Sequence, residues 1–335
     1  MEGELVCLGI ESSAHTFGVG IVTSSGRILA NESSVYRPRD SGIHPREAAQ
    51  HHANVAHSVL GRALEVAGLR LKEIDAIAFT AGPGLGPCLR TGATVARALA
   101  YRLGRPLVAV NHGVAHIEIG RLSTGFEDPI ALYVAGGNTL VTTHSAGRYR
   151  ILGETLDIAA GNCLDAFGIK VGIGPMPAPE QLASRGERYV PLPMRVKGMD
   201  VSFSGLLTRA LALARSGQYR IEDLCLSLTE AVYSMLVEVL ERAVALTGKR
   251  EVLVVGGLAR SRRLSQMVSE MVKLHGASFE QIPDELLGDN GAMIAWTGLL
   301  MLEHGMTVPI EESRVRPRFR IDEVEVPWMR GHSKS

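Results

Sequence analysis

A run of three short strands occurs twice in this sequence, and this duplication limits the possible folds more than any other feature. In each copy an apolar strand leads through a polar turn into a second strand, and a tight turn containing glycine leads into a third. The strand segments are residues 5–10, 17–23 and 27–32 in the first copy and residues 130–134, 139–144 and 149–154 in the second. Two related lobes, each built on a sheet, are therefore expected.

After each triplet comes a further strand that ends in glycines. Residues 75–80 lead into the glycine-rich loop 81–87, and residues 251–255 lead into Gly256 and Gly257. We expect both loops to open a helix, whose bare backbone N–H groups attract anions, so the pattern indicates phosphate groups held between two lobes. A single glycine pair is more often a tight turn, and neither loop has the spacing of a P-loop or a dinucleotide fingerprint.

The length also favours two lobes, because 335 residues exceed the size at which one hydrophobic core usually stops growing. With 46% hydrophobic and 21% charged residues, the composition is that of a folded enzyme. The sequence therefore predicts a duplicated two-lobe α/β fold. We expect an N-terminal lobe over residues 1–125, a C-terminal lobe over residues 126–329 and a disordered tail over residues 330–335.

Charge gives no global indication of a partner, because Lys plus Arg and Asp plus Glu both number 35. Any RNA site must be local, and three arginine groups are candidates, although solvated loops are the more common explanation. These groups are Arg37, Arg39 and Arg46; Arg260, Arg262 and Arg263; and Arg314, Arg316, Arg318 and Arg320. Four scattered cysteines without a C-x-x-C pair or a secretory signal predict a cytoplasmic location, and no apolar run is long enough to span a membrane.

His112 and His116 are the most suggestive pair of side chains. Four residues apart on a helix, they share one face and can bind one metal ion. Zincin proteases have a glutamate directly after the first histidine, but here that position is Gly113, and Glu118 points to the opposite side of the helix. Further ligands must come from elsewhere, and Tyr133 and Asp289 are candidates.

The alternative is two histidines satisfied by hydrogen bonds at the start of a helix. In that reading Asp289 is a helix N-cap, with Asn290, for residues 291–304, and Tyr133 is a half-buried strand residue. A second histidine group, His44, His51, His52 and His57, lies around a helix that Pro45 is expected to begin, and a solvated helix face is its predicted role.

The order of many short motifs resembles the archaeal and eukaryotic type of tRNA N6-adenosine threonylcarbamoyltransferase, the catalytic subunit of the KEOPS complex. The match covers nearly the whole chain. The motifs are Gly9-Ile10-Glu11, Ala14-His15-Thr16, His44-Pro45-Arg46-Glu47, Gly82-Pro83-Gly84, Val110-Asn111-His112, Leu132-Tyr133-Val134, Gly153-Glu154-Thr155, Lys197-Gly198-Met199-Asp200, Ser202-Phe203-Ser204-Gly205, Val255-Gly256-Gly257, Asp289-Asn290-Gly291 and Asp322-Glu323-Val324.

The resemblance implies an actin-like, Hsp70-like and sugar-kinase-like fold with the metal and nucleotide site at an interlobe cleft. It implies that one iron or zinc ion is bound by His112, His116, Tyr133 and Asp289. It also implies an ATP- or AMP-type nucleotide, bound by a second set of residues that shares Tyr133 with the metal site. These are Tyr133, Val134, Ala135, Gly136, Gly137, Asn138, Asp165, Met176, Glu180, Gly256, Gly257 and Ser261.

The implied reaction moves the threonylcarbamoyl group of threonylcarbamoyl-AMP onto N6 of adenosine 37 in tRNAs that read ANN codons. The implied partners are tRNA and the KEOPS subunits, which include a small protein kinase, and no membrane. Because adenine N6 is a poor nucleophile, orientation and charge stabilisation must supply most of the acceleration. Glu11 is the candidate catalytic carboxylate that positions or deprotonates the attacking amine, with a capping or lobe-bridging role as its alternative.

Four positions depart from the family pattern around the presumed site. Met176 replaces a glycine, Ser261 replaces an asparagine, Gly113 replaces a cysteine and Ala135 replaces a serine. All four presumed metal ligands are nevertheless present. Two alternatives therefore accompany the transferase: an ATP-dependent phosphotransferase or ATPase of the same fold, and a non-catalytic KEOPS-like scaffold whose altered loops no longer accept a nucleotide.

Overall fold

A computed structural model describes residues 3–37, 44–135 and 137–329 of the chain and divides them into two compact units. Unit 1 contains the described chain up to Gly125, the segment Ser145–Tyr149 and the described chain from Pro283 onward. Unit 2 contains Phe126–His144 and Arg150–Ile282. The expected tail, residues 330–335, lies outside the described residues.

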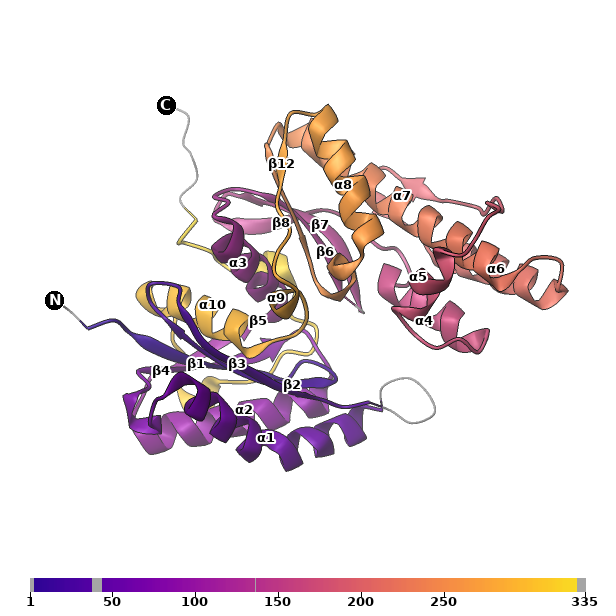
Figure 1. Cartoon of the computed structure of the whole chain (residues 1–335). Helices are drawn as coiled ribbons and strands as arrows, with labels where there is room; N and C mark the ends of the chain where they lie inside the picture. Colours follow the sequence, from indigo (N-terminus) through magenta and orange to yellow (C-terminus); the bar gives the residue numbers. More distant parts are fainter. Residues whose placement is uncertain (1–2, 38–43, 136, 330–335) are drawn as a thin grey trace. The chain divides into compact units, whose positions relative to one another are not determined.

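The sheet of unit 1 has five strands in the order β3-β2-β1-β4-β5. These strands are β1 (Val6–Glu11), β2 (Thr16–Thr23), β3 (Ile28–Val35), β4 (Ala76–Gly82) and β5 (Leu107–Asn111). Helices α1 (Pro45–Ala67) and α2 (Gly86–Leu103) cover one face, and α10 (Gly291–Glu303) covers the other, beside α3 (His112–Thr124) (Figure 1). Short turns η1 (Leu71–Glu73), α9 (Asp284–Leu287), η3 (Ile310–Glu312) and η4 (Ile321–Glu323) connect the rest.

Unit 2 repeats this topology. Its five-stranded sheet has the order β8-β7-β6-β11-β12, which is the order of unit 1 with the second set of strands. The strands are β6 (Ile130–Ala135), β7 (Asn138–Ser145), β8 (Arg148–Glu154), β11 (Glu251–Val255) and β12 (Ser278–Phe279). In both sheets the first strand pairs antiparallel with the second and parallel with the fourth, so the predicted duplication is confirmed.

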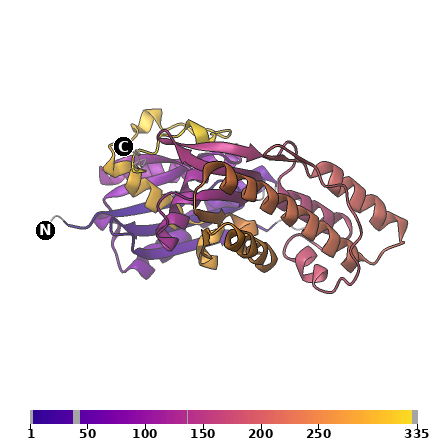
Figure 2. The ribbon, with the colours of Figure 1, turned by 90° about the horizontal axis from the view of Figure 1, so that it is seen from above.

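The helices of unit 2 pack on one another and on the strands of its sheet. They are α4 (Ala160–Lys170), α5 (Ala178–Ala183), α6 (Ser204–Ser216), α7 (Ile221–Thr247) and α8 (Arg262–Leu274), with η2 (Gly257–Arg260) before α8 and a small hairpin of β9 (Val196–Lys197) and β10 (Asp200–Val201). Helices α6 and α7 lie side by side in both views (Figure 2). None of the helices in the described ranges has the length and apolar character needed to cross a membrane.

Helix α10 explains why the units differ from the expected division at residue 125. That division places everything after residue 125 in the C-terminal lobe, whereas the chain from Pro283 groups with unit 1. The physical reason is close backbone packing: a Cβ on Gly291 would lie 2.0 Å from the Gly20 nitrogen, and a Cβ on Gly9 would lie 2.2 Å from the Ala295 nitrogen. Glycines on both partners therefore allow α10 to lie directly on β1 and β2.

One residue of the second histidine group is part of the core. His52 of α1 is fully buried, its ring lies 5.6 Å from that of Phe17, and its Nε2 contacts the Ala14 carbonyl oxygen at 3.1 Å. The expectation of a solvated face is therefore wrong for His52, although His57 is exposed. Burial first, and the neighbouring His51 next, lower the pKa of His52 from 6.5 to about 4.

This buried histidine predicts a pH-dependent stability. Above pH 6.5 His52 is neutral in both states, but between pH 6.5 and about 4 the unfolded chain binds a proton that the folded chain does not. We expect the free energy of unfolding to fall by about 2 kcal/mol across this window because of His52. Urea unfolding at pH 7 and pH 4.5 measures this loss, and His52→Gln should reduce it; an equal loss in both proteins would contradict the assignment.

Candidate metal centre

The start of α3 is fixed by Asn111, the last residue of β5. Its Oδ1 accepts hydrogen bonds from the backbone nitrogens of Gly113 at 2.9 Å and Val114 at 3.1 Å. Its Nδ2 donates to the Phe319 carbonyl oxygen at 3.1 Å. This cap makes His112 the first residue of the helix. Sequence reasoning did not assign Asn111 this role, although an asparagine directly before a helix is a recognised N-cap signal.

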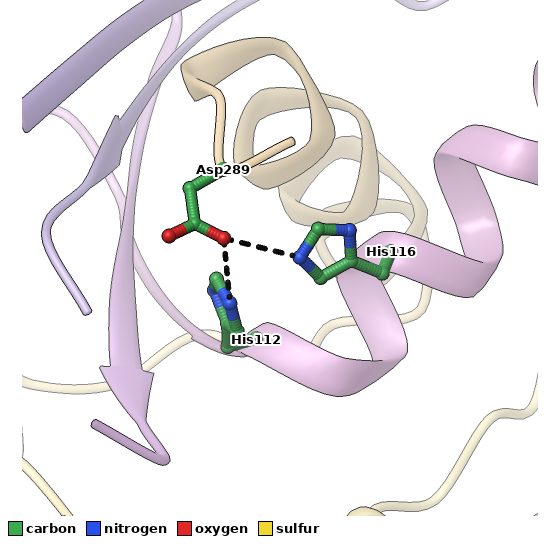
Figure 3. A group of neighbouring side chains, drawn as sticks. All are labelled: His112, His116 and Asp289. Atoms are coloured by element: carbon green, nitrogen blue, oxygen red, sulfur yellow. Dashed lines mark ion pairs between the residues drawn. The ribbon is translucent and has the colours of Figure 1, made fainter. Parts of the chain in front are cut away.

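His112 and His116 share one face of α3, as their spacing predicts. Their ring centroids are 4.7 Å apart and their planes are nearly perpendicular, at 89°. Both side chains are almost completely buried. Asp289 Oδ1 lies 3.3 Å from His112 Nε2 and 3.4 Å from His116 Nε2, so one carboxylate oxygen faces both rings (Figure 3).

Asp289 is not the N-cap of α10, which was the alternative to metal binding. Asn290 is the N-cap, and its Oδ1 accepts from the Met293 backbone nitrogen at 2.9 Å. The carboxylate of Asp289 is therefore directed at the two histidines instead of at the helix backbone. Burial opposes its charge, but the two histidines outweigh burial and hold the pKa of Asp289 well below its usual range.

Glu11 is hydrogen-bonded to His112 from the other side of the ring. Its side chain, at the end of β1, has no exposed surface. Oε2 lies 3.0 Å from His112 Nδ1 and accepts from Thr80 Oγ1 at 2.5 Å, and Oε1 accepts from the Ser13 backbone nitrogen at 2.6 Å. Burial raises the pKa of Glu11, but the interactions with His112 and Ser13 prevail and lower it. Glu11 is thus a charged group that orients His112, and neither Thr80 nor Ser13 was singled out from the sequence.

These atoms fit a divalent metal. The two imidazoles and the Asp289 carboxylate each offer one donor atom, and the three atoms lie within 4.8 Å of one another. The same carboxylate oxygen lies 3.3 Å and 3.4 Å from the two ring nitrogens, so one ion could contact all three donor atoms. A carboxylate on the second nitrogen of a ligating histidine is the usual outer partner in such sites. Two imidazoles and one carboxylate are donor groups that zinc and non-haem iron accept in proteins.

Glu118 does not face the two histidines, as its position in the helix predicts. It is buried on another side of α3, where it accepts from the Tyr149 hydroxyl at 2.6 Å and from Arg121 Nη1 at 2.6 Å. It therefore does not supply the general base that a zincin protease needs.

The predicted nucleotide residues belong to unit 2 and lie partly beside one another. Val255 pairs with Tyr133 across β11 and β6, and Ala135 pairs with Asn138 across the β6–β7 turn. A Cβ on Gly256 would lie 2.6 Å from the Val134 carbonyl oxygen, so this backbone contact depends on glycine, as does the φ of +97°. Gly137 belongs to the turn that follows Gly136, and Gly136 lies outside the described residues. Tyr133 lies inside β6, two residues before its end, and is buried, with 2% of its surface exposed.

The other nucleotide candidates form two internal pairs. Asp165 Oδ1 accepts from the Met176 backbone nitrogen at 2.8 Å, and Glu180 Oε1 accepts from Ser261 Oγ at 2.6 Å. The buried Tyr233, which sequence reasoning missed, lies with its hydroxyl 3.3 Å from Glu180 Oε2. Ser261 is also the N-cap of α8, where it accepts from Leu264 at 3.0 Å. Gly256 and Gly257 therefore open the short turn η2 and not the helix itself, contrary to the expectation for this loop.

Comparison with known proteins identifies the family. A family model for TsaD, tRNA N6-adenosine threonylcarbamoyltransferase, matches residues 27–296. Proteins with that name from Thermofilum pendens and Caldivirga maquilingensis are 59% and 52% identical to this chain, with 97% of this chain and 97% and 98% of those proteins covered. The protein of that name from Thermococcus kodakarensis is 51% identical over 97% of this chain and its own full length.

Solved structures at low identity share the fold. The HypF structure from Thermococcus kodakarensis matches with a TM-score of 0.61 and 15% identity over 90% of this chain and 48% of HypF. Component A of (R)-2-hydroxyglutaryl-CoA dehydratase from Acidaminococcus fermentans matches with a TM-score of 0.55 and 12% identity, over 88% of this chain and 98% of that protein. These neighbours confirm the predicted duplicated actin-like fold class. On the strength of the family model and these relatives, the chain belongs to the tRNA N6-adenosine threonylcarbamoyltransferase family, whose members modify adenosine in tRNA by threonylcarbamoyl transfer.

Proposed function

We propose that the chain transfers the threonylcarbamoyl group from threonylcarbamoyl-AMP to N6 of adenosine 37 in tRNAs reading ANN codons, with the help of one iron or zinc ion. The observation that carries the metal part is the arrangement of His112, His116 and Asp289, whose donor atoms converge within 4.8 Å. The transfer of a threonylcarbamoyl group to tRNA is proposed from family membership, and threonylcarbamoyl-AMP is proposed as the donor of that group. Tyr133 is proposed as a fourth ligand.

The residues of unit 1 have separable roles in this proposal. His112 and His116 present Nε2 atoms, and Asp289 contributes the negative charge that holds a cation there. Glu11 Oε2 accepts a hydrogen bond from His112 Nδ1–H, and this tautomer leaves the lone pair of Nε2 free to coordinate. We propose this positioning role for Glu11 in place of proton abstraction from the attacking amine, because its carboxylate is buried and bonded to Thr80 and Ser13. When bound, the metal would polarise donor oxygens as a Lewis acid and template them for attack.

The adenylate would bind through unit 2. Val134, Ala135, Gly137 and Asn138 at the β6–β7 turn and the Gly256–Gly257 turn would offer backbone groups. Gly136, outside the described residues, is proposed as part of the same site. Glu180 and Asp165 would supply carboxylates, with Met176 and Ser261 beside them. The Ser261 hydroxyl donates to Glu180 Oε1 at 2.6 Å. Although serine is shorter than the asparagine usual in the family, it therefore still fixes the Glu180 carboxylate as an acceptor for the nucleotide.

We also propose that the chain acts in the cytoplasm with tRNA and the KEOPS subunits, including the small protein kinase. Cys7, Cys88, Cys163 and Cys225 are free thiols in the structure, which agrees with a reducing compartment. The phosphotransferase and scaffold alternatives are not favoured, because the relatives that match the whole chain are named as threonylcarbamoyltransferases.

Reconstituted transfer tests this proposal. The purified chain, the KEOPS partners, unmodified tRNA and threonylcarbamoyl-AMP should give threonylcarbamoyladenosine when the tRNA is digested to nucleosides and analysed by mass spectrometry. Removal of the metal by a chelator should lower the yield at least about 100-fold, and added iron or zinc should restore it. Absence of the nucleoside with the untreated protein would refute the transfer, whereas an unchanged yield after verified metal removal would refute the metal's role.

A further inference from the structure

A basic surface loop of unit 2 has no role in the chemistry described above. We call residues 184–197, between α5 and the end of β9, the basic loop. Its four cationic side chains, Arg185, Arg188, Arg195 and Lys197, are all exposed, and its single carboxylate is Glu187. Tyr189 and Met194 are also exposed, at 46% and 53%. This is a local positive charge in a chain whose net charge is zero.

The backbone of the basic loop is held firmly although most of it has no regular secondary structure. Asp223 Oδ1 of α7 accepts from the backbone nitrogens of Glu187 at 2.9 Å and Arg188 at 3.1 Å. Ser227 Oγ accepts from the Val190 nitrogen at 2.7 Å, and the Val190 side chain is buried. Fixed backbone with exposed side chains is a preorganised surface, which lowers the entropy cost of binding.

The cations of the loop are not neutralised by their surroundings. Glu187 pairs with Arg220 at 3.4 Å and not with a cation of the loop, and Arg188 lies 5.7 Å from the centre of the Tyr219 ring. Among the residues that the structure describes, no carboxylate lies within 4.0 Å of a basic nitrogen of Arg185, Arg195 or Lys197. Like charges kept together without counter-charges favour an anionic partner.

A nearby hollow extends this charge. The hollow has a volume of about 200 Å³ and is lined by residues at the ends of α4 and α6 and by Ile221, the residue that follows Arg220 in the chain. Lys170 and Arg215 line it, and both are exposed. No ion pair involves either side chain within the described ranges. The positive surface therefore includes the hollow as well as the loop.

We propose that the basic loop, together with Lys170 and Arg215, binds backbone phosphates of the tRNA substrate and that Tyr189 stacks on an unpaired base. Arginines interspersed with an exposed aromatic ring are the pattern that recognises RNA backbone and unstacked bases. An acidic peptide would explain the cations but gives no reason for the exposed tyrosine. The inference rests on the proposed function only in taking tRNA as the substrate.

The test compares two charge-reversed triple variants of the full chain. One carries Arg185→Glu, Arg195→Glu and Lys197→Glu. The control carries the same charge change at exposed positions elsewhere, Lys72→Glu, Arg102→Glu and Lys273→Glu. Fluorescence anisotropy with labelled unmodified tRNA across a potassium chloride series gives the affinity and its salt dependence.

We expect the loop variant to bind tRNA at least about tenfold more weakly than the control, with a slope of log K against log salt that is smaller by about 2 to 3. Tyr189→Ala should weaken binding about fivefold or more without changing the slope. Equal affinities in the two triple variants would overturn the proposal. So would a loop variant that retains tRNA binding but no longer associates with the kinase partner, which would make the loop a protein interface.

Failure of this inference can be told apart from failure of the proposed transfer. In the reconstituted assay the loop variant should retain its metal and its kcat and show a raised KM for tRNA. If the wild-type chain made no threonylcarbamoyladenosine, the transfer proposal would fail while the anisotropy comparison still decided the role of the loop. A loop variant with lowered kcat and unchanged KM would count against phosphate binding.

Discussion

Replacing His116 with alanine should yield a folded protein that retains less than about a tenth of the metal of the wild type and transfers threonylcarbamoyl at least about 100-fold more slowly. The reason is geometric: His116 Nε2 is one of two nitrogens that face the same oxygen of Asp289, and its removal leaves only His112 and Asp289 of the three donors in unit 1. Elemental analysis of dialysed protein measures the metal separately from the activity. Circular dichroism and thermal unfolding check the fold.

Two further variants test whether the loss of metal and activity is specific to the proposed ligands. His57→Ala removes an exposed histidine of α1 and should leave metal content and transfer unchanged. Glu11→Gln retains the size of the side chain but removes its charge next to His112 Nδ1, so we expect metal affinity to fall by about 10- to 100-fold while transfer recovers at saturating metal. His116→Ala protein that still held one ion per chain would contradict the proposed centre. A Glu11→Gln enzyme with full metal and no transfer would instead make Glu11 directly catalytic.

The second large effect concerns stability. Gly291→Ala should lower the free energy of unfolding by at least about 3 kcal/mol, because the added Cβ would lie 2.0 Å from the Gly20 nitrogen and 2.3 Å from the Val19 carbonyl carbon. Both contacts are with backbone of β2, which cannot turn aside as a side chain can. Urea denaturation followed by circular dichroism measures the change.

Gly61→Ala is the matched control for this substitution. Gly61 is also a helical glycine of unit 1, but a Cβ there would meet nothing within 4 Å. Because alanine is the better helix former, we expect this variant to be as stable as the wild type or more stable by up to ~1 kcal/mol. If Gly291→Ala were no less stable than Gly61→Ala, the close approach of α10 to the sheet would be incorrect.

The repeated strands could be predicted because each is a run of apolar residues bounded by a turn, and such patterns are local. The edge strands β5 and β12 were not predicted. Strand β12 has only two residues, and β5 leads directly into α3 without the glycine turn that marked the other strands. The sequence also could not predict that α10 packs in unit 1. This packing depends on Gly9, Gly20 and Gly291 meeting in space, and a glycine in a sequence does not reveal what approaches it.

The candidate metal centre could likewise be predicted only in part from the sequence. The spacing of His112 and His116 places two rings on one helical face, and the structure shows this face. The spacing does not supply the third ligand, because Asp289 comes from a distant part of the chain and looks like a helix cap beside Asn290. Likewise, a carboxylate at Glu11 suggested acid–base chemistry, and only its burial and its contacts with Thr80 and Ser13 indicate a positioning role.

The place of Asp289 in the chain has a consequence for biosynthesis. His112 and His116 are synthesised about 170 residues before Asp289. The segment that contains Asp289 also contains α10, which covers the sheet of unit 1. A nascent chain that ends before Pro283 therefore has neither the third metal donor nor the cover for β1 and β2. Binding of the proposed metal and closure of this core therefore both require that the segment containing Asp289 and α10 has already been synthesised.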